Sequence, residues 1–291
     1  MGRLTRDERI VAALLEWGGP ELRDLPWRRT DDPGCVLVSE VMLQQTSVAR
    51  VLPRYDSFIG RFPDPASLAD APLGDALALW QGLGYPRRCR NLHAAAVVIA
   101  RDLGGVFPRT LEGLLALPGV GQYTARAVLA FTRTADSAVV DTNVSRVLSR
   151  LDGRSMTARE LQQRADGLVP QGLGWEWNQV LMDFGATLCT ARNPSCDGCP
   201  LARHCSWAGD TTVVDPAPGS AAASRPQARF EGSDRQARGR AMRALVERPR
   251  SRAELVEAMQ LTTDAARAGS LVDALVAEGL AVESGGVVTL P

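Results

Sequence analysis

A short turn with two glycines constrains this chain more than any other stretch. Residues 117–125 read Leu-Pro-Gly-Val-Gly-Gln-Tyr-Thr-Ala, and an apolar helical pattern follows at once. Pro118, Gly119 and Gly121 favour a tight turn, because glycine adopts backbone angles that other residues avoid. Such a turn directs backbone N–H groups outward beside the positive end of the next helix. The sequence therefore predicts a helical hairpin that binds an anion, and phosphate is the natural one.

An acid follows this hairpin. Asp141 ends the apolar pair Val139-Val140, just before Thr142-Asn143. An acid in such a position is usually either the N-cap of a helix or a catalytic group. Residues 117–141 thus combine a phosphate-binding turn, the polar Tyr123 and a carboxylate. A plain helical hairpin with a capping aspartate stays the alternative.

The composition narrows the class of protein. With 291 residues, 45% of them hydrophobic, the chain can form about two domains. No run is long enough to cross a membrane and the N-terminus is unlike a secretory signal, so we expect a cytoplasmic protein. The formal net charge is zero, so nucleic acid would bind local patches rather than the overall field. All 33 residues in the Lys and Arg class are arginine, so no lysine amine can form a Schiff base.

Four of the cysteines cluster near residue 200. The spacing is C-x6-C-x2-C-x5-C, formed by Cys189, Cys196, Cys199 and Cys205. In a cytosolic chain such a cluster favours a metal site over disulfides. Structural zinc sites usually bring two close pairs of ligands, whereas here only one pair is close. Four thiolates in one compact loop suit a [4Fe–4S] cluster better, with zinc as the alternative.

A second acid stands inside an apolar helical stretch at residues 36–52. Glu40 lies between Ser39 and Val41. A buried carboxyl is costly unless it has a task or a partner. Burial would also raise its pKa and suit it to donate a proton near neutral pH. The alternative is a glutamate on the solvent face of the helix.

A glycine-rich turn at residues 80–86 carries an aromatic side chain. Leu83 and Tyr85 in it would wedge into a base stack, and the arginines that follow would contact phosphates: Arg87, Arg88 and Arg90. A helix–helix turn with a solvated basic face is the alternative interpretation.

Three more residues allow two interpretations each. Trp27 fits either the core or a nucleic-acid contact, and Arg28 beside it fits a phosphate or base contact. Gln179 stands in an apolar helical stretch at 175–185, either as a polar contact or as a hydrogen-bonded core residue.

The composition changes from about residue 211. Residues 211–232 are rich in Pro, Ala and Ser, which is typical of a linker. Residues 233–291 then show three helical segments and an apolar end with two glycines, the order of a winged helix. We expect this unit to contact DNA or a protein, since no residue in it looks catalytic.

These motifs occur together, and in this order, in one protein family. The segments 39–46, 117–125 and 140–144 and the four-cysteine loop resemble those of the helix-hairpin-helix DNA glycosylases. Residues 25–28 and the segment around Glu40 are similar to the adenine glycosylase (MutY) branch rather than to endonuclease III. The resemblance covers roughly residues 5–210.

The resemblance implies an all-α fold in several parts. An iron–sulfur cluster domain would comprise residues 1–27 and 135–210, and a six-helix domain with the helix-hairpin-helix would span residues 28–134. The linker at 211–232 and the winged-helix-like unit at 233–291 follow. The four cysteines would ligate a [4Fe–4S] cluster.

Catalytic roles also follow from the resemblance. Glu40 stands at the position of the general acid that protonates adenine, and Asp141 at that of the carboxylate that stabilises the sugar cation. Tyr123 stands where bifunctional relatives have their Schiff-base lysine. Asn143 matches a polar active-site position, and Gln179 one that faces the adenine.

DNA contacts are implied in the same way. Gly119 and Gly121 belong to the phosphate-binding hairpin. The residues expected to line the DNA and its oxidised guanine are Trp27, Arg28, Gln45, Thr46, Leu83, Gly84 and Tyr85. Many adenine glycosylases also carry a nucleotide-hydrolase-like domain that reads 8-oxoguanine, but residues 233–291 are too few for it and look different.

The expected reaction is hydrolytic base removal in base excision repair. The substrate would be adenine mispaired with 8-oxoguanine or guanine in double-stranded DNA, flipped out of the helix. Two carboxyls divided between acid and stabiliser follow the logic of glycoside cleavage. We expect a monofunctional, monomeric enzyme at the nucleoid, with no membrane partner. The alternatives are a thymine or uracil mismatch glycosylase of the same fold and a non-catalytic iron–sulfur DNA-binding protein.

Overall fold

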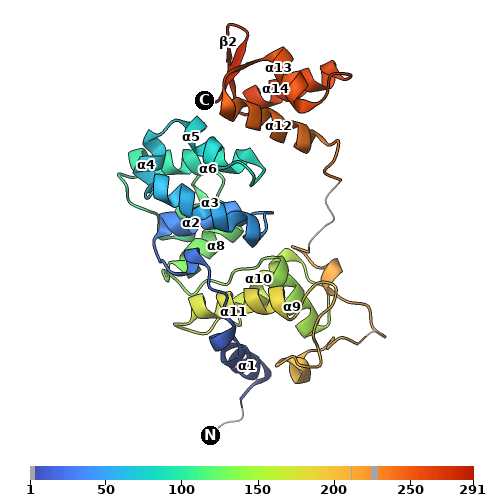
Figure 1. Cartoon of the computed structure of the whole chain (residues 1–291). Coiled ribbons are helices and arrows are strands. Elements are labelled where there is room, and N and C mark those ends of the chain that lie inside the picture. The colour runs from blue at the N-terminus through green and yellow to red at the C-terminus, as the bar shows by residue number, and fades with distance from the viewer. Residues whose placement is uncertain (1–3, 211, 224–228) are drawn as a thin grey trace. The chain divides into compact units, whose positions relative to one another are not determined.

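The computed structural model describes residues 4–210, 212–223 and 229–291 (Figure 1). This part of the chain is mostly helical with one small sheet near the C-terminus, which confirms the expected all-α helix-hairpin-helix fold. Residues 211 and 224–228 of the expected linker lie outside the described residues. No helix in the described ranges is long and apolar enough to cross a membrane.

The chain divides into two compact units, each built from separate stretches. The first unit comprises Met1–Asp32, Arg109–Leu115 and Val120–Pro226. The second unit comprises Pro33–Pro108, Ala116–Gly119 and Gln227–Pro291. The chain therefore passes between the units several times.

The first unit is a bundle of helices around aliphatic and aromatic side chains. Its main helices are α1 (Arg6–Glu21), α7 (Leu111–Leu115), α8 (Gln122–Phe131), α9 (Thr142–Asp152), α10 (Ala158–Asp166) and α11 (Gly174–Thr187). Capping boxes begin α1 at Thr5 and α10 at Thr157, as their sequences predict. The core includes Trp177 and Phe184 of α11, both at most 1% exposed.

Part of the linker segment is packed in the first unit. A 3-10 turn at Ala217–Gly219 contacts α9. The Ser220 hydroxyl bonds the Ser149 hydroxyl at 2.6 Å, and Ala221 donates its N–H to the Met156 carbonyl at 2.9 Å. Small Ser and Ala side chains, which suggested a linker by composition, here permit close backbone packing.

The second unit contains the apolar helix with the internal glutamate. Its helices before residue 103 are α2 (Pro33–Leu43), α3 (Val48–Arg61), α4 (Pro65–Asp70), α5 (Leu73–Leu79) and α6 (Pro86–Val97). A π-helical turn at Val98–Asp102 extends α6. Residues 36–42 of α2 are all buried, because apolar side chains surround this helix on nearly every face.

The C-terminal end of the second unit has the order of a winged helix. Its elements are α12 (Asp234–Glu247), β1 (Arg250–Ser251), α13 (Arg252–Met259), α14 (Ala265–Ala277), β2 (Val282–Ser284) and β3 (Val287–Thr289). The strands form an antiparallel sheet in the order β1-β3-β2, which lies beside the three helices (Figure 1). We call residues 233–291 the C-terminal unit.

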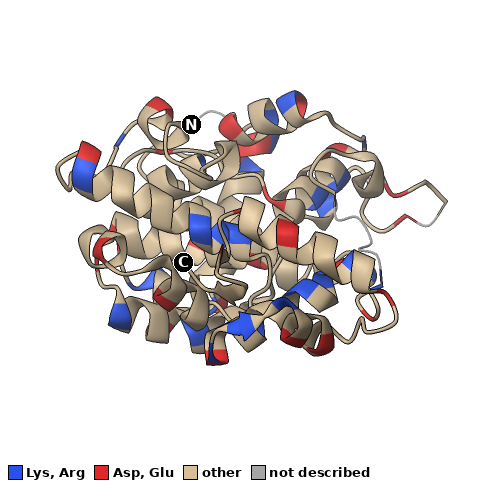
Figure 2. Ribbon diagram, turned by 90° about the horizontal axis from the view of Figure 1, so that it is seen from above, with Lys and Arg blue, Asp and Glu red and all other residues tan. Residues whose placement is uncertain are grey.

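Charges of both signs are distributed along the helices. Figure 2 shows arginines and acidic residues interspersed in the part of the chain that the structure describes. This mixture accords with the formal net charge of zero.

Gly18 tests the packing of α1 on α11. A methyl group at Gly18 would overlap the Val180 side chain, so Gly18→Ala should lower the free energy of unfolding by about 1–3 kcal/mol. Gly60, in α3, has open space around its Cα, so Gly60→Ala should be neutral or stabilise by up to about 1 kcal/mol. Urea unfolding of both variants measures the difference, and equal effects would contradict the packing argument.

Candidate functional site

Glu40 is a buried acid on α2. Only 4% of the residue is exposed, so the solvent-face interpretation is wrong. The preceding Ser39 is also buried, and its hydroxyl donates to the Val36 carbonyl of the same helix at 2.8 Å. The burial of Glu40 accords with its neighbours, since the residues of α2 from Val36 to Met42 are all buried.

Asp141 begins α9 as its N-cap. Its Oδ1 accepts hydrogen bonds from the backbone N–H groups of Asn143 at 2.8 Å and Val144 at 2.7 Å. Its Oδ2 accepts from Asn143 Nδ2 at 2.8 Å. Burial raises the pKa of Asp141 above its ordinary value, although these donors oppose the rise. The capping role is confirmed, and a catalytic role is compatible with it because three N–H donors favour the ionised form.

Asn143 connects this carboxyl to the cysteine loop through an arginine that the sequence did not single out. Arg146 Nη2 donates to Asn143 Oδ1 at 2.8 Å and to the Gly185 carbonyl at 2.6 Å. Its Nε donates to the Cys189 carbonyl at 2.8 Å. A Cβ at Gly185 would lie 2.7 Å from Asn143 Cβ, so this glycine permits the close approach of α9 and α11.

Gln179 and Tyr123 lie on neighbouring helices of the first unit. Gln179 of α11 is 5% exposed, and Tyr123 in the first turn of α8 is half-buried. Asn178 of α11 binds the backbone of the segment that leads to Asp141. Its Oδ1 accepts a hydrogen bond from Val139 N–H and its Nδ2 donates one to the Ser137 carbonyl, both at 2.8 Å. Sequence reasoning missed Asn178, and a second amide beside Gln179 on an apolar helix was the available signal.

Trp27 and Arg28 lie inside the first unit. Trp27 is 7% exposed, which favours its interpretation as a core residue. The Arg28 guanidinium donates to both oxygens of Asp183, at 2.7 and 2.8 Å, and so ties the 3-10 turn Pro26–Arg28 to α11. Arg23 donates to the same carboxylate at 2.9 Å. A DNA contact by Trp27 or Arg28 stays a prediction, and for Arg28 it would compete with this ion pair.

The side chain of Asp183 is fully buried, and its arginine partners favour its ionised form. Its side chain is 0% exposed and that of Arg28 is 8% exposed. Burial raises the pKa of Asp183, but hydrogen bonds from Arg28 and Arg23 outweigh it and leave the pKa below its ordinary value. The sequence signal was an acid inside an apolar helix, the same signal that singled out Glu40.

One arginine holds together the two loops of the second unit that were expected to touch DNA. Arg88 Nη1 donates to the carbonyls of Val41, Met42 and Gln44 at 2.6–2.9 Å, at the end of α2. Its Nη2 donates to Thr46 Oγ1 at 3.0 Å and to the carbonyls of Leu83 and Gly84 at 3.1 Å. The expected phosphate contact of Arg88 is wrong for this geometry, because carbonyls in the protein occupy both of its terminal nitrogens.

The other residues of these two loops differ in exposure and in backbone conformation. Gln45 is exposed with φ +54°, and Thr46 donates to the Leu83 carbonyl at 3.2 Å. Leu83 is only 2% exposed, so it would have to leave the core to reach a base stack. Gly84 and Tyr85 both have positive φ, +73° and +48°. For tyrosine this is an uncommon conformation that the surroundings must maintain.

The glycines of the hairpin between α7 and α8 have different roles. Gly119 has φ +76°, and a Cβ there would lie 2.6 Å from Asn91 Cβ. Both its backbone angle and its packing therefore require glycine. Gly121 is the N-cap of α8 in extended conformation, φ −97°, with open space around it. Its exposed backbone at the start of α8 suits the expected phosphate contact.

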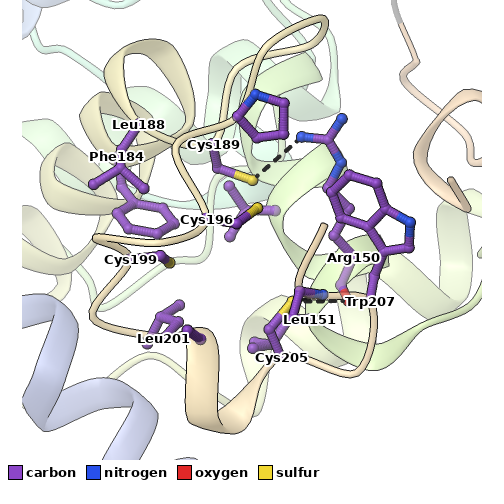
Figure 3. Close-up of a pocket in the computed structure, with 14 residues that line it drawn as sticks. Arg150, Leu151, Phe184, Leu188, Cys189, Cys196, Cys199, Leu201, Cys205 and Trp207 are labelled. Atoms are coloured by element: carbon purple, nitrogen blue, oxygen red, sulfur yellow. Dashed lines mark hydrogen bonds between the residues drawn. The ribbon is translucent and has the colours of Figure 1, made fainter. Parts of the chain in front are cut away.

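The four clustered cysteines line one cavity. It has about 400 Å³ of empty volume, including its mouth, and its other lining is mostly apolar. Figure 3 shows Cys189, Cys196, Cys199 and Cys205 around this space, between Phe184 and Trp207. Four thiols arranged around one mostly apolar space fit an iron–sulfur cluster held by thiolates.

Arg150 supports the cysteine loop from the side of α9. It is 2% exposed, donates to Cys189 Sγ at 3.5 Å and to the Thr190 carbonyl at 2.7 Å, and its guanidinium lies 4.5 Å from the Trp207 ring (Figure 3). Asp215, from the packed linker segment, pairs with it at 2.6 Å. Sequence reasoning missed Arg150, since its neighbours in the fold are distant in the chain.

The Arg28–Asp183 pair generates a stability prediction. Asp183→Asn should lower the free energy of unfolding by about 3–5 kcal/mol near pH 7, because it leaves the Arg28 cation buried without its counter-charge. The pKa of Asp183 is lowered in the folded state. The loss of unfolding free energy in Asp183→Asn should therefore be largest at pH values above the ordinary aspartate pKa, and it should decrease as the pH falls through the pKa of Asp183 in the folded protein. Urea unfolding between pH 7 and pH 3 measures this. Asp24→Asn, in an exposed pair with Arg29, is the control and should change little; a similar small effect at Asp183 would contradict the prediction.

Comparisons with known proteins agree with this geometry. Residues 38–171 match the HhH-GPD superfamily base excision DNA repair protein family, and residues 189–205 match the iron-sulfur binding domain of endonuclease III, which confirms the four cysteines as ligands of the expected [4Fe–4S] cluster. The chain is 43% identical to the adenine DNA glycosylase of Mycolicibacterium smegmatis over 92% of its own length and 90% of that protein.

Two solved structures are also similar. A thermostable thymine-DNA glycosylase matches with a TM-score of 0.66 and 31% identity over 70% of this chain and 97% of that one. An endonuclease III in a non-covalent DNA complex shares the fold, with a TM-score of 0.62 and 22% identity over 72% of this chain and 99% of that one. From its motifs, its cysteine cavity and these matches, the chain belongs to the adenine DNA glycosylase family of the HhH-GPD superfamily.

Proposed function

We propose that this protein is a monofunctional DNA glycosylase that hydrolyses the N-glycosidic bond of adenine mispaired with 8-oxoguanine or guanine in double-stranded DNA. The observation that carries the proposal is the buried Glu40 in a chain 43% identical to an adenine DNA glycosylase. A protein that only binds DNA gains nothing from a carboxyl kept 4% exposed on an apolar helix.

Glu40 supplies the proton in this proposal. Adenine is a poor leaving group, and protonation of a ring nitrogen allows the bonding electrons to leave with the base. A carboxyl with little access to water is suited to this step, because its protonated form avoids the cost of a buried charge. Gln179, nearly as buried as Glu40, is proposed to contact the adenine through its side-chain amide.

Asp141 stabilises the sugar cation that base departure leaves behind. Burial raises its pKa, but its two backbone donors and Asn143 Nδ2 favour the carboxylate. A developing positive charge on the sugar opposes this rise in the pKa of Asp141, so the anion becomes favoured as the transition state forms. Arg146 holds Asn143 in place for this task.

The absence of lysine supports hydrolysis without strand cleavage. A β-lyase step through a Schiff base needs an amine nucleophile, and the chain has no lysine side chain. Tyr123, which the resemblance places at the position of that lysine, carries a phenol and no amine, so it cannot form an imine. Water is therefore the proposed nucleophile, and an abasic site the proposed product.

DNA contacts in this proposal come from both units. The backbone at Gly119 and Gly121 grips phosphates, while Gln45, Thr46 and Tyr85 line the side of the duplex with the oxidised guanine. Leu83 and Gly84 shape the turn that carries Tyr85.

The protein is proposed to act as a monomer on chromosomal DNA in the cytoplasm. Cys189, Cys196, Cys199 and Cys205 would hold the [4Fe–4S] cluster, which would cross-link the loop at 189–205. Arg146 and Arg150 join this loop to α9.

A thymine mismatch glycosylase is the second candidate, since the structure of a thermostable thymine-DNA glycosylase is 31% identical in sequence to this chain. A panel of duplexes with A:8-oxoguanine, A:G, T:G and U:G, treated with alkali after incubation, separates the candidates. We expect cleavage of the two adenine duplexes and none without alkali, because the product is an abasic site. Cleavage confined to T:G or U:G would favour the second candidate, and tight binding without cleavage would favour a non-catalytic protein.

Removal of the proposed acid tests the mechanism. Glu40→Gln should slow single-turnover adenine release by about 10²–10⁴-fold, the usual size of a general-acid contribution. DNA affinity should stay close to that of the wild type, because the amide has the same shape. Glu16→Gln, at an exposed position of α1, is the matched control and should keep wild-type rates. Near-normal release by Glu40→Gln would remove Glu40 from the mechanism.

A further inference from the structure

Tyr85 occupies a restrained position at the end of the glycine turn. It precedes α6 in the left-handed region, with φ +48° and ψ +61°. The carbonyls of the two residues before it are held by Arg88, and the Arg88 guanidinium lies 5.4 Å from the Tyr85 ring. Arg88 thus fixes the backbone of the turn and one side of the ring, but it does not contact the hydroxyl through any described hydrogen bond.

The C-terminal unit supplies the contact to that hydroxyl. Arg235, in the first turn of α12, donates from Nη1 to the Tyr85 hydroxyl at 3.2 Å. Its guanidinium also lies 5.3 Å from the Phe230 ring, which limits where the arginine can point. A residue 150 positions away in the chain therefore contacts the tip of the phenol.

This contact is one part of a wider docking surface on α5 and α6. The Arg90 side chain of α6 donates to the Glu278 carbonyl, and Arg87 of α6 lies 3.9 Å from the Glu278 carboxylate, which Arg238 pairs with inside the C-terminal unit at 2.6 Å. At the other end, Gly74 of α5 donates its N–H to the Pro291 carbonyl at 2.8 Å.

The docking surface is closely packed at Gly74. A Cβ at this position would lie 2.9 Å from the Pro291 carbonyl oxygen. Glycine at residue 74 therefore permits the approach, and the C-terminal unit is held at both ends of the segment that carries the glycine turn.

We propose that the C-terminal unit is a positioning element for lesion recognition, and that Arg235 is its contact residue. By holding the Tyr85 hydroxyl, Arg235 keeps the phenol in one orientation toward the base opposite the adenine. Discrimination between 8-oxoguanine and guanine then depends on a unit that carries no catalytic group. The inference rests on the proposed function, because it assigns Tyr85 to that side of the duplex.

Restraint of the Tyr85 side chain should affect recognition of the base opposite the adenine. A tyrosine held only by its backbone can rotate about its side-chain bonds, and each alternative rotamer lowers the population that fits the duplex. A hydrogen bond from a cation to the hydroxyl removes that freedom at the tip of the side chain. Because the restraint acts at the base opposite the adenine, its loss should affect one duplex more than the other.

Single-turnover adenine release from A:8-oxoguanine and A:G duplexes by the full-length protein tests the proposal. Arg235→Ala should slow release from A:8-oxoguanine roughly threefold to tenfold, the scale of one ordinary hydrogen bond, and affect A:G less. Tyr85→Phe, which removes only the hydroxyl oxygen, should reproduce this change. The double variant should add nothing further, and Arg235→Lys should recover part of the loss.

Arg243→Ala is the matched control, since Arg243 is exposed on the same helix. It should keep the wild-type rates on both duplexes. Wild-type discrimination in Arg235→Ala, equal slowing on both duplexes, or additive effects of Arg235→Ala and Tyr85→Phe would overturn the proposal. If Arg235→Ala fails to fold, wild-type discrimination in Tyr85→Phe overturns it alone. A wild-type protein that releases adenine from neither duplex would instead overturn the proposed function itself.

Discussion

The guanidinium of Arg88 makes the interactions on which the two loops at residues 44–46 and 80–86 of the second unit depend. It satisfies carbonyls at the end of α2 that have no partner within the helix, and it bonds the turn that leads into α6. Burial lowers the pKa of Arg88 to about 10, so it stays a cation at neutral pH. The same side chain therefore ends the helix of Glu40 and shapes the turn of Tyr85, and neither can shift independently of the other.

Arginine has a similar function in the first unit. Arg28 joins a loop to α11 through Asp183, Arg146 joins Asn143 to the backbone of the cysteine loop, and Arg150 joins α9 to that loop and to Asp215. Each guanidinium offers several donors in a fixed plane, so one side chain can join three segments. In a chain without lysine, buried arginines thus connect the helices that carry the proposed active-site residues.

Much of the site was predictable because its residues stand out locally. An acid inside an apolar helix, a pair of glycines before a helix and four closely spaced cysteines are visible without knowledge of the fold. These patterns singled out Glu40 and Asp141, and the structure then showed that Glu40 is buried and that Asp141 caps α9. Arg28 and Arg88 were harder, because an arginine beside a glycine turn or a tryptophan looks the same whether its side chain points to solvent or to buried carbonyls.

By itself the sequence determined the helices, the cysteine site and the two carboxyls, because periodicity, capping and ligand spacing act over a few residues. Only the tertiary structure decided which polar side chains form their hydrogen bonds and ion pairs inside the protein. Asp183 pairs with Arg28, carbonyls at the end of α2 accept hydrogen bonds from Arg88, and the Tyr85 hydroxyl accepts one from Arg235 of the C-terminal unit. Such pairings join residues that are distant in the chain. For the buried Asp183 and the carbonyls at the end of α2, the cost of a buried polar group without a partner favours them once the helices pack.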